Sequence, residues 1–309
     1  MSGGRNIAVE ALSSSGVQRR GFILIAIAAV LWGTVGISTR TLYELTATDA
    51  LSIGFFRLAL ATPAMVFMAA VAAPRGVRLS RRDTLIAILV GVLLALYQWC
   101  YFTAISLSGV TVATLVTLCT APVIAALVAV PLAGERLSWA IALALVLALV
   151  GTALLIGVQP HMQLAPATVV GASFALGSAA GYALLTVCGR LMSAQAHPLL
   201  LNRIAFPVGA LLLLLIALPS GLTVSYPPIG WGLLLYLGLV PTALAYALFF
   251  IGMRSTAATS ATIITLLEPL TATLLATALF EEQLPPLGLV GGALLLAALG
   301  VLYSRKSSA

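Results

Sequence analysis

The sequence predicts an all-α polytopic membrane protein with ten transmembrane helices, arranged as two inverted five-helix repeats. Three observations lead to this fold class. Of the 309 residues, 61% are apolar and only 7% are charged, whereas a soluble domain carries about 25% charged residues. The apolar residues fall into ten stretches, each close to the ~20 residues that a membrane span requires. The second half of the chain also repeats features of the first half.

Turn-forming residues divide the apolar stretches from one another, as at Gly134-Glu135-Arg136 and Pro227-Pro228. The weakest division separates the third stretch from the fourth, where only residues 106–109 are left for a loop. The predicted helices cover residues 21–40, 50–73, 84–105, 110–132, 138–157, 167–191, 198–218, 229–251, 258–280 and 286–303.

An internal repeat appears at an offset of 147 residues. Nine of 36 positions match without a gap when residues 102–137 are laid on residues 249–284, including a proline pair and the pair Glu135 and Glu282. Because five helices are an odd number, the second copy enters the membrane from the opposite side, as in many secondary transporters. The predicted organisation is an N-terminal tail (1–20), two five-helix repeats (21–157 and 167–303) and a C-terminal tail (304–309).

The basic residues predict the orientation. If the N-terminus is cytoplasmic, twelve Lys and Arg residues fall on that side and only Arg40 falls on the other. Because cytoplasmic loops accumulate Lys and Arg, we expect a multi-pass protein of the inner (cytoplasmic) membrane with both termini in the cytoplasm. Arg19-Arg20 could also begin an export signal, but the apolar stretch continues through Trp32 to Ile37, which favours a span.

Composition and spacing exclude several other classes of protein. The net charge of +7 is distributed over the ends of apolar stretches, whereas a nucleic-acid binder gathers its charge in one soluble patch, so no nucleic-acid partner is expected. Cys100, Cys119 and Cys188 lie inside apolar runs without metal or redox spacing. His161 and His197 belong to no metal motif, and no phosphate loop is present. We therefore expect neither an enzyme nor a cofactor.

Several motifs occur at characteristic places in the predicted spans. Trp32-Gly33 lies in the first span, Arg57 in the second and Glu268-Pro269 in the ninth, which is followed by Glu281-Glu282 in a short loop. In this combination the chain resembles the drug/metabolite transporter superfamily. Within it the chain is most similar to EamA-type exporters, with the YddG-like amino-acid exporters as the subgroup. The resemblance implies export of a small substrate along a central path. One departure is Ala121, which takes the place of Glu268 in the first half.

Glu268 is the one carboxylate well inside a predicted span, where a charge costs ~2.5–3.5 kcal/mol even on insertion scales. It is predicted to contact a substrate ammonium or a coupled proton. The alternative is a structural carboxylate bonded to backbone groups that Pro269 frees, or one paired with an arginine. Pro122 and Pro269 are the predicted hinges. Arg57 could hold a substrate carboxylate, or it could serve packing, together with its counterpart Arg203.

Aromatic residues inside the spans predict a polar, water-accessible site. Tyr97 and Tyr101 are four residues apart and share a helix face. Tyrosines bonded across packed helices are the alternative interpretation. Thr117 belongs to a stripe of threonines that either lines a path or bends its helix. The predicted substrate-binding residues are Trp32, Tyr97, Tyr101, Thr117, Tyr182, Tyr246 and Glu268.

The sequence therefore predicts a secondary transporter that exports small metabolites, with neutral and aromatic amino acids as the substrate class, by alternating access between the repeats. Other small amphipathic compounds or drugs are the alternative cargo. A membrane-embedded enzyme or a channel would be a different class of protein. The partners expected are the substrate and the lipid bilayer, and a monomer is the expected state.

Overall fold

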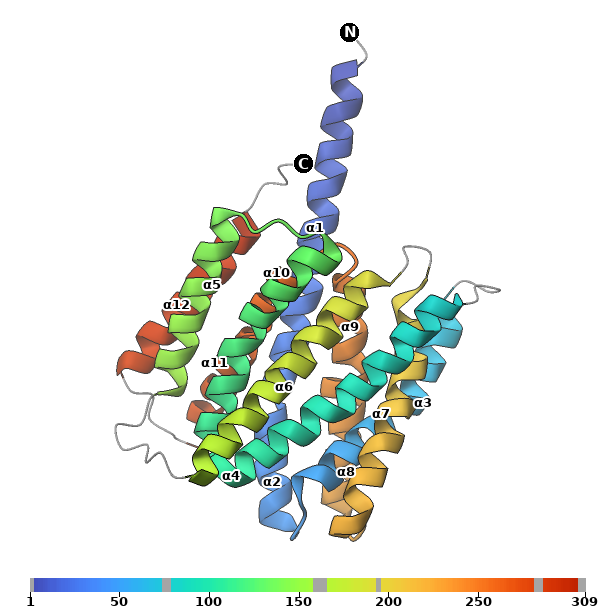
Figure 1. Cartoon of the computed structure of the whole chain (residues 1–309), viewed down its shortest axis with the longest axis vertical. Coiled ribbons are helices and arrows are strands. Elements are labelled where there is room, and N and C mark those ends of the chain that lie inside the picture. The colour runs from blue at the N-terminus through green and yellow to red at the C-terminus, as the bar shows by residue number, and fades with distance from the viewer. Residues whose placement is uncertain (1–2, 74–78, 158–165, 193–195, 281–285, 305–309) are drawn as a thin grey trace.

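The computed structural model describes residues 3–73, 79–157, 166–192, 196–280 and 286–304. These residues form a bundle of helices joined by turns, without a strand in the part described. Figure 1 shows that the first described helix begins, and the last one ends, at the same end of the bundle. His161, Glu281 and Glu282, which the sequence analysis singles out, lie outside the described residues.

Nine helical segments of the described ranges are long and apolar enough to cross a membrane. Their positions follow the predicted spans, which confirms a helical membrane protein. The helices are α1 (Gly3–Gly33), α2 (Val35–Leu45), α3 (Ala50–Ala72), α4 (Arg81–Ala133), α5 (Trp139–Ile156), α6 (Pro166–Leu191), α7 (Pro198–Ala217), the short η1 (Leu218–Ser220), α8 (Pro228–Gly238), η2 (Leu239–Leu244), α9 (Ala245–Gly252), α10 (Ala258–Ile264), α11 (Leu267–Phe280) and α12 (Pro286–Ser304).

Helix α4 holds the predicted third and fourth spans in one element of 53 residues. At 1.5 Å per residue such a helix would be roughly 80 Å long, far more than the ~30 Å of hydrocarbon that a span crosses. It does not run straight, because Gly109 is non-helical with φ of 80°, and Figure 1 shows the chain reversing direction there. The reversal lies at the short division predicted at residues 106–109. The ten-helix count and the inverted repeat stay predictions.

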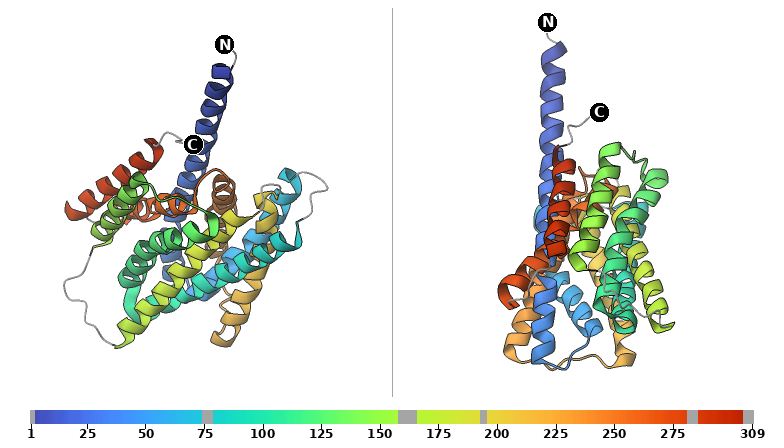
Figure 2. Two further views of the ribbon diagram at one scale, coloured as in Figure 1. Left: turned by 45° about the horizontal axis from the view of Figure 1, so that its top comes forward. Right: turned by 90° about the vertical axis from the view of Figure 1, so that its left-hand side faces the viewer.

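The N-terminal segment is helical where the sequence analysis expects a tail. Helix α1 begins at Gly3 and continues without a break into the first apolar segment. Figures 1 and 2 show its first turns projecting beyond the rest of the bundle. The hydropathy pattern marks only the part of this helix that lies among its neighbours.

Two apolar segments contain an interruption in their middle. The first breaks at Thr34, whose hydroxyl donates to the carbonyl of Leu31 at 2.7 Å. The eighth contains the π-helix η2 between α8 and α9. Pro241 lies in η2 and has no N–H for the helical ladder. The apolar pattern alone does not show either break, although Pro241 marks a candidate kink in the sequence. Irregular turns of this kind are frequent at functional sites.

The ninth apolar segment is divided into α10 and α11 by Thr265 and Leu266. The amide of Glu268 donates to the carbonyl of Thr265 at 3.0 Å, a bond over three residues. The next residue is Pro269, which has no amide proton to offer that carbonyl. The helix is therefore interrupted one turn before Pro269, whereas α4 continues as helix through Pro122. That the two prolines are hinges stays a prediction.

Glycines bring several helices into close contact. A Cβ on Gly181 of α6 would lie 2.9 Å from the Cβ of Tyr97 on α4. In the pair formed by α5 and α12, a Cβ on Gly151 would lie 2.8 Å from the backbone oxygen of Gly291, and one on Gly291 would lie 2.5 Å from that of Gly151. Small residues at helix crossings allow membrane helices to pack closely. Figure 1 shows α5 and α12 side by side.

Candidate functional site

Two tyrosines from different halves of the chain meet in the bundle. The hydroxyls of Tyr97 on α4 and Tyr246 on α9 are hydrogen bonded at 2.7 Å. Tyr182 on α6 packs edge-on against Tyr97, with ring centroids 5.8 Å apart. Three of the predicted site residues therefore lie together, contributed by three helices.

Trp32 extends this aromatic cluster from α1. Its ring lies 4.9 Å from that of Tyr246 and 5.3 Å from that of Phe249, and only 6% of the residue is exposed. The contact depends on a close crossing of α1 and α9, since a Cβ on Gly252 would lie 2.7 Å from the backbone oxygen of Gly21. The close packing of α1 against α9 thus holds this part of the aromatic cluster in place.

Two polar atoms of the cluster are buried without a hydrogen bond. Among the described residues, neither the indole Nε1 of Trp32 nor the hydroxyl of Tyr182 has a partner. Thr265 lies close to Tyr182. Its hydroxyl donates to the carbonyl of Thr262 at 2.9 Å and keeps lone pairs that can accept from another donor. Because an unpaired buried polar group costs about 1–3 kcal/mol, these two atoms can bind the polar groups of a ligand.

Glu268 lies in the first turn of α11 and is partly buried. Within the described ranges its carboxylate makes no hydrogen bond and no ion pair. The carboxylate is within electrostatic range of Tyr97, Tyr182 and Arg57. A carboxylate that bonds to no described residue and lies near the aromatic cluster is available to a cation or a proton.

Arg57 on α3 supplies the opposite charge. Its Nε donates to the hydroxyl of Thr242 in η2 at 3.2 Å, so the irregular turn of the eighth segment holds this guanidinium. A guanidinium has five N–H donors, and the described residues provide no carboxylate partner for it. Arg203, the predicted counterpart, is exposed. The two arginines therefore differ in environment. Arg57, which the sequence left open between substrate binding and packing, lies within electrostatic range of Glu268.

Two other predicted site residues use their hydroxyls within the bundle. Tyr101 is hydrogen bonded to Thr114 at 2.7 Å, across the reversal in α4. Thr117 is buried and donates to the backbone carbonyl of Ala175 on α6 at 3.2 Å. Tyr101 still lies within electrostatic range of Glu268, whereas the contacts of Thr117 join α4 to α6.

The motif Trp32-Gly33 positions α1 against α11. A Cβ on Gly33 would lie 2.5 Å from the Cβ of Thr271 and 2.9 Å from the backbone oxygen of Glu268. Only a glycine allows this approach. Gly33 thereby places Glu268 next to the helix that carries Trp32, which explains physically why the two motifs occur together.

The comparisons with known proteins identify the family. Residues 19–157 and 169–304 match the EamA-like transporter family. The chain belongs to this family. It is therefore a multi-pass membrane transporter and not an enzyme, as the motifs predict. The two matched segments divide the chain between the two predicted repeats.

Two relatives and one solved structure resemble this EamA-like transporter. It is 33% identical to the uncharacterized transporter YwfM of Bacillus subtilis, over 91% of this chain and 92% of the relative. It is 32% identical to an uncharacterized transporter of Archaeoglobus fulgidus, over 94% of this chain and 97% of that protein. A crystal structure with 22% sequence identity superposes with a TM-score of 0.78 and covers 91% of this chain and 97% of its own. This last similarity concerns the fold alone.

Proposed function

We propose that this EamA-like transporter exports small zwitterions, above all neutral amino acids with aromatic or large aliphatic side chains. Transport would occur by alternating access through the site around Glu268. The observation that carries the proposal is the pair of opposite charges, Glu268 and Arg57, which lie within electrostatic range of each other without forming an ion pair.

The two charges match the two ends of an amino acid. A substrate ammonium would bind the carboxylate of Glu268, and a substrate carboxylate would bind the guanidinium of Arg57, whose planar fork suits carboxylates. In transporters of this type substrates bind near the bilayer midplane, where helices are discontinuous. The interrupted turns at Thr34, at Thr265 and in η2 belong to the segments that carry the site.

The aromatic cluster accounts for the preferred side chains. Trp32, Tyr97 and Tyr182 offer apolar area, and a well-placed ring pair contributes ~0.5–1.5 kcal/mol beyond burial. Sugars lack both charges, and phosphorylated compounds would be repelled by Glu268. An amphipathic amine, as in many drugs, would satisfy Glu268 but leave Arg57 without an anion.

Competition in proteoliposomes tests this proposal. The uptake of labelled phenylalanine would be measured against three unlabelled competitors. Phenylalanine has both charges, phenethylamine has only the ammonium, and phenylpropionate has only the carboxylate. We expect phenylalanine to compete at least tenfold better than either analogue. In the Arg57→Gln variant, the advantage of phenylalanine over phenethylamine should disappear.

Two results would contradict the proposal. Equal competition by phenethylamine in the unmodified protein would indicate an exporter of amphipathic amines. Uptake of labelled sugars without uptake of any amino acid would exclude zwitterions as the cargo. Arg203→Gln serves as the matched control, because Arg203 is exposed and should leave the competition unchanged.

A further inference from the structure

A second candidate binding site lies apart from the aromatic cluster, at the end of the bundle from which α1 projects (Figure 1). A hollow of about 140 Å³ opens between the end of α6, the start of α7 and the end of α9. One water molecule needs only about 10–15 Å³ measured in this way. The hollow can therefore hold a chemical group of several atoms.

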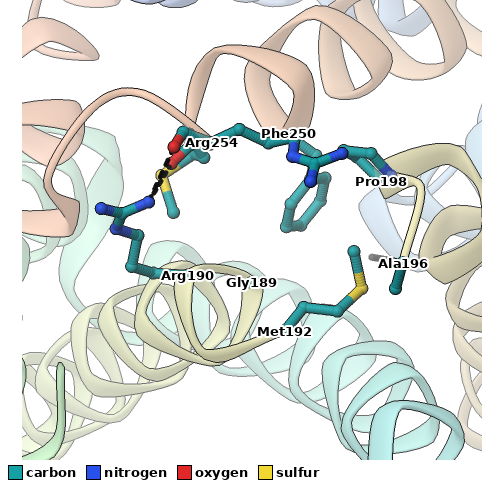
Figure 3. A pocket seen from close by; sticks show the side chains of 8 residues that line it. Gly189, Arg190, Met192, Ala196, Pro198, Phe250 and Arg254 are labelled. Atoms are coloured by element: carbon teal, nitrogen blue, oxygen red, sulfur yellow. Dashed lines mark hydrogen bonds between the residues drawn. The ribbon is translucent and has the colours of Figure 1, made fainter. Parts of the chain in front are cut away.

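The floor and the rim of the hollow differ in chemistry. Phe250, Met253 and Ala196 form an apolar floor, with 4%, 1% and 4% of each residue exposed. Arg190 and Arg254 are exposed at the rim. Figure 3 shows the two arginines reaching the hollow from α6 and from the end of α9, with the ring of Phe250 pointing into it. None of the lining residues is acidic.

Arg190 is fixed in position but keeps donors for a ligand. Its Nη1 donates to the backbone carbonyls of Met253 and Arg254, at 3.2 and 2.9 Å. These bonds anchor the guanidinium at the turn that follows α9. Nε and Nη2 form no hydrogen bond with any described residue, so they can still bind an anion.

The electrostatic environment of the hollow is positive. His197, the residue before α7, is partly buried, and this burial together with the charge of Arg254 lowers its pKa from the usual value. The neutral form of His197 is therefore more favoured than in an exposed histidine. Arg82 adds a further positive charge nearby, because its Nη2 lies 3.5 Å from the carbonyl of Leu191 at the end of α6.

We propose that this hollow binds the phosphate group of an anionic phospholipid from the cytoplasmic leaflet. The arginine count predicts that this end of the bundle is cytoplasmic. Anionic lipids are concentrated on that side, and basic pockets between helices bind their headgroups there. Arg190 and Arg254 contact the phosphate, and the glycerol and first acyl carbons cover Phe250 and Met253. A free phosphate compound shares the charge but leaves the apolar floor uncovered.

Lipid titrations of the purified full-length protein test the proposal. The thermal unfolding midpoint would be measured against dihexanoyl phosphatidylglycerol, dihexanoyl phosphatidylcholine and inorganic phosphate. We expect a saturable rise with phosphatidylglycerol alone. The half-saturating concentration should increase about tenfold in Arg254→Gln, which amounts to about 1.4 kcal/mol, and should stay unchanged in Arg136→Gln, an exposed arginine outside the hollow.

A second variant tests the apolar floor of the hollow without removing a charge. Ala196→Leu places a larger apolar side chain on the floor and should weaken phosphatidylglycerol binding with both arginines intact. The proposal is overturned if phosphatidylcholine gives the same rise, or if Arg254→Gln and Ala196→Leu both bind phosphatidylglycerol like the unmodified protein. A rise with inorganic phosphate alone would overturn the lipid as the source of the phosphate.

Discussion

The carboxylate of Glu135 binds the start of α10, accepting hydrogen bonds from the backbone amide of Thr259 at 3.2 Å and from its hydroxyl at 2.8 Å. The amide of Ala258 donates to the same carboxylate. Glu135 lies in the turn after α4, so the contact joins the first half of the chain to the second. It satisfies amides at a helix start that have no partner within their own helix.

Replacing Glu135 should destabilise the protein. We expect Glu135→Ala to lower the free energy of unfolding by about 1.5–3 kcal/mol, the usual contribution of hydrogen bonds to a charged group. The measurement is denaturant unfolding in detergent. Glu44→Ala is the control, because Glu44 forms an exposed ion pair with Arg40 and such pairs contribute about 0–1 kcal/mol. Equal effects of the two substitutions would show that the Glu135 contact is not stabilising.

Glu268 should determine the pH dependence of transport. If its carboxylate takes up a proton or binds the substrate ammonium during the cycle, Glu268→Gln removes the group that titrates. We expect slower uptake of phenylalanine and a flat pH profile from about pH 6 to about pH 8, roughly one unit on either side of neutrality. The measurement is proteoliposome uptake at a series of pH values. Glu44→Gln should keep the original profile, and an unchanged profile in Glu268→Gln would leave Glu268 a structural role.

The hydrogen bond between Tyr97 and Tyr246 should be visible as an interaction energy. Each single Phe variant leaves one buried hydroxyl unpaired, at a cost of about 1–3 kcal/mol, whereas the double variant removes both hydroxyls and can be nearly neutral. We therefore expect Tyr97→Phe and Tyr246→Phe to be less destabilising together than their sum. Additive effects on unfolding would show that the two hydroxyls do not interact.

Substitution by alanine tests whether the aromatic cluster binds the substrate. Tyr97 and Tyr246 differ in how much their replacement should destabilise the protein. Tyr246 is 3% exposed and also contacts Phe206, so Tyr246→Ala should lose about 3–5 kcal/mol of stability. Tyr97→Ala should weaken the uptake of aromatic and large aliphatic amino acids at normal expression. Normal uptake by the folded Tyr97→Ala variant would exclude the aromatic cluster from the substrate site.

Gly33 should not tolerate a methyl group. In Gly33→Ala the new Cβ would overlap Thr271 and the backbone oxygen of Glu268, and overpacking of this kind costs about 1–3 kcal/mol. We expect a lower unfolding midpoint together with reduced uptake. Gly36→Ala is the matched control, because a Cβ at Gly36 meets nothing within 4 Å. If Gly36→Ala has the larger effect, the close contact between α1 and α11 is not what holds Glu268.

The predicted topology can be tested with reporter fusions. Fusions after residues 80 and 309 should report a cytoplasmic location, and fusions near residues 162 and 223 an external one, because of the arginine distribution. The readout is a pair of reporters, each active on only one side of the membrane. A cytoplasmic location at residue 162 would contradict the five-plus-five arrangement.

Hydropathy predicted most of the helices because each span must be apolar over a fixed length. Hydropathy cannot detect breaks inside a span. The sequence around Thr34 and η2 is as apolar as the sequence of an uninterrupted helix. Hydropathy also missed the helical start of α1, because this part of the helix is too polar to be detected as an apolar segment. Breaks were predictable where a proline marks them in the sequence, as Pro269 does beside Glu268 and Pro241 does in η2.

The candidate site was predictable in part. Residue type and depth in a span single out Trp32, Tyr97, Tyr182 and Glu268, because polar and aromatic groups inside a membrane need a partner or a function. Thr117 could not be separated from them by sequence, since a threonine that bonds to a neighbouring helix has the same spacing as one that lines a path. Arg57 was visible as a charge in a span. Its contact with η2 depends on the π-helical form of that turn, which the sequence does not predict.

The glycine contact between α5 and α12 has a consequence for how the protein is made. Helix α5 ends at residue 156 and α12 begins at residue 286, so about 130 residues must be synthesised before α5 can meet this neighbour. At ~5–20 residues per second that interval lasts roughly 6–26 s. Throughout it the face of α5 around Gly151 must be covered by lipid or by the membrane insertion machinery. Completion of the first half thus awaits the last helix to leave the ribosome.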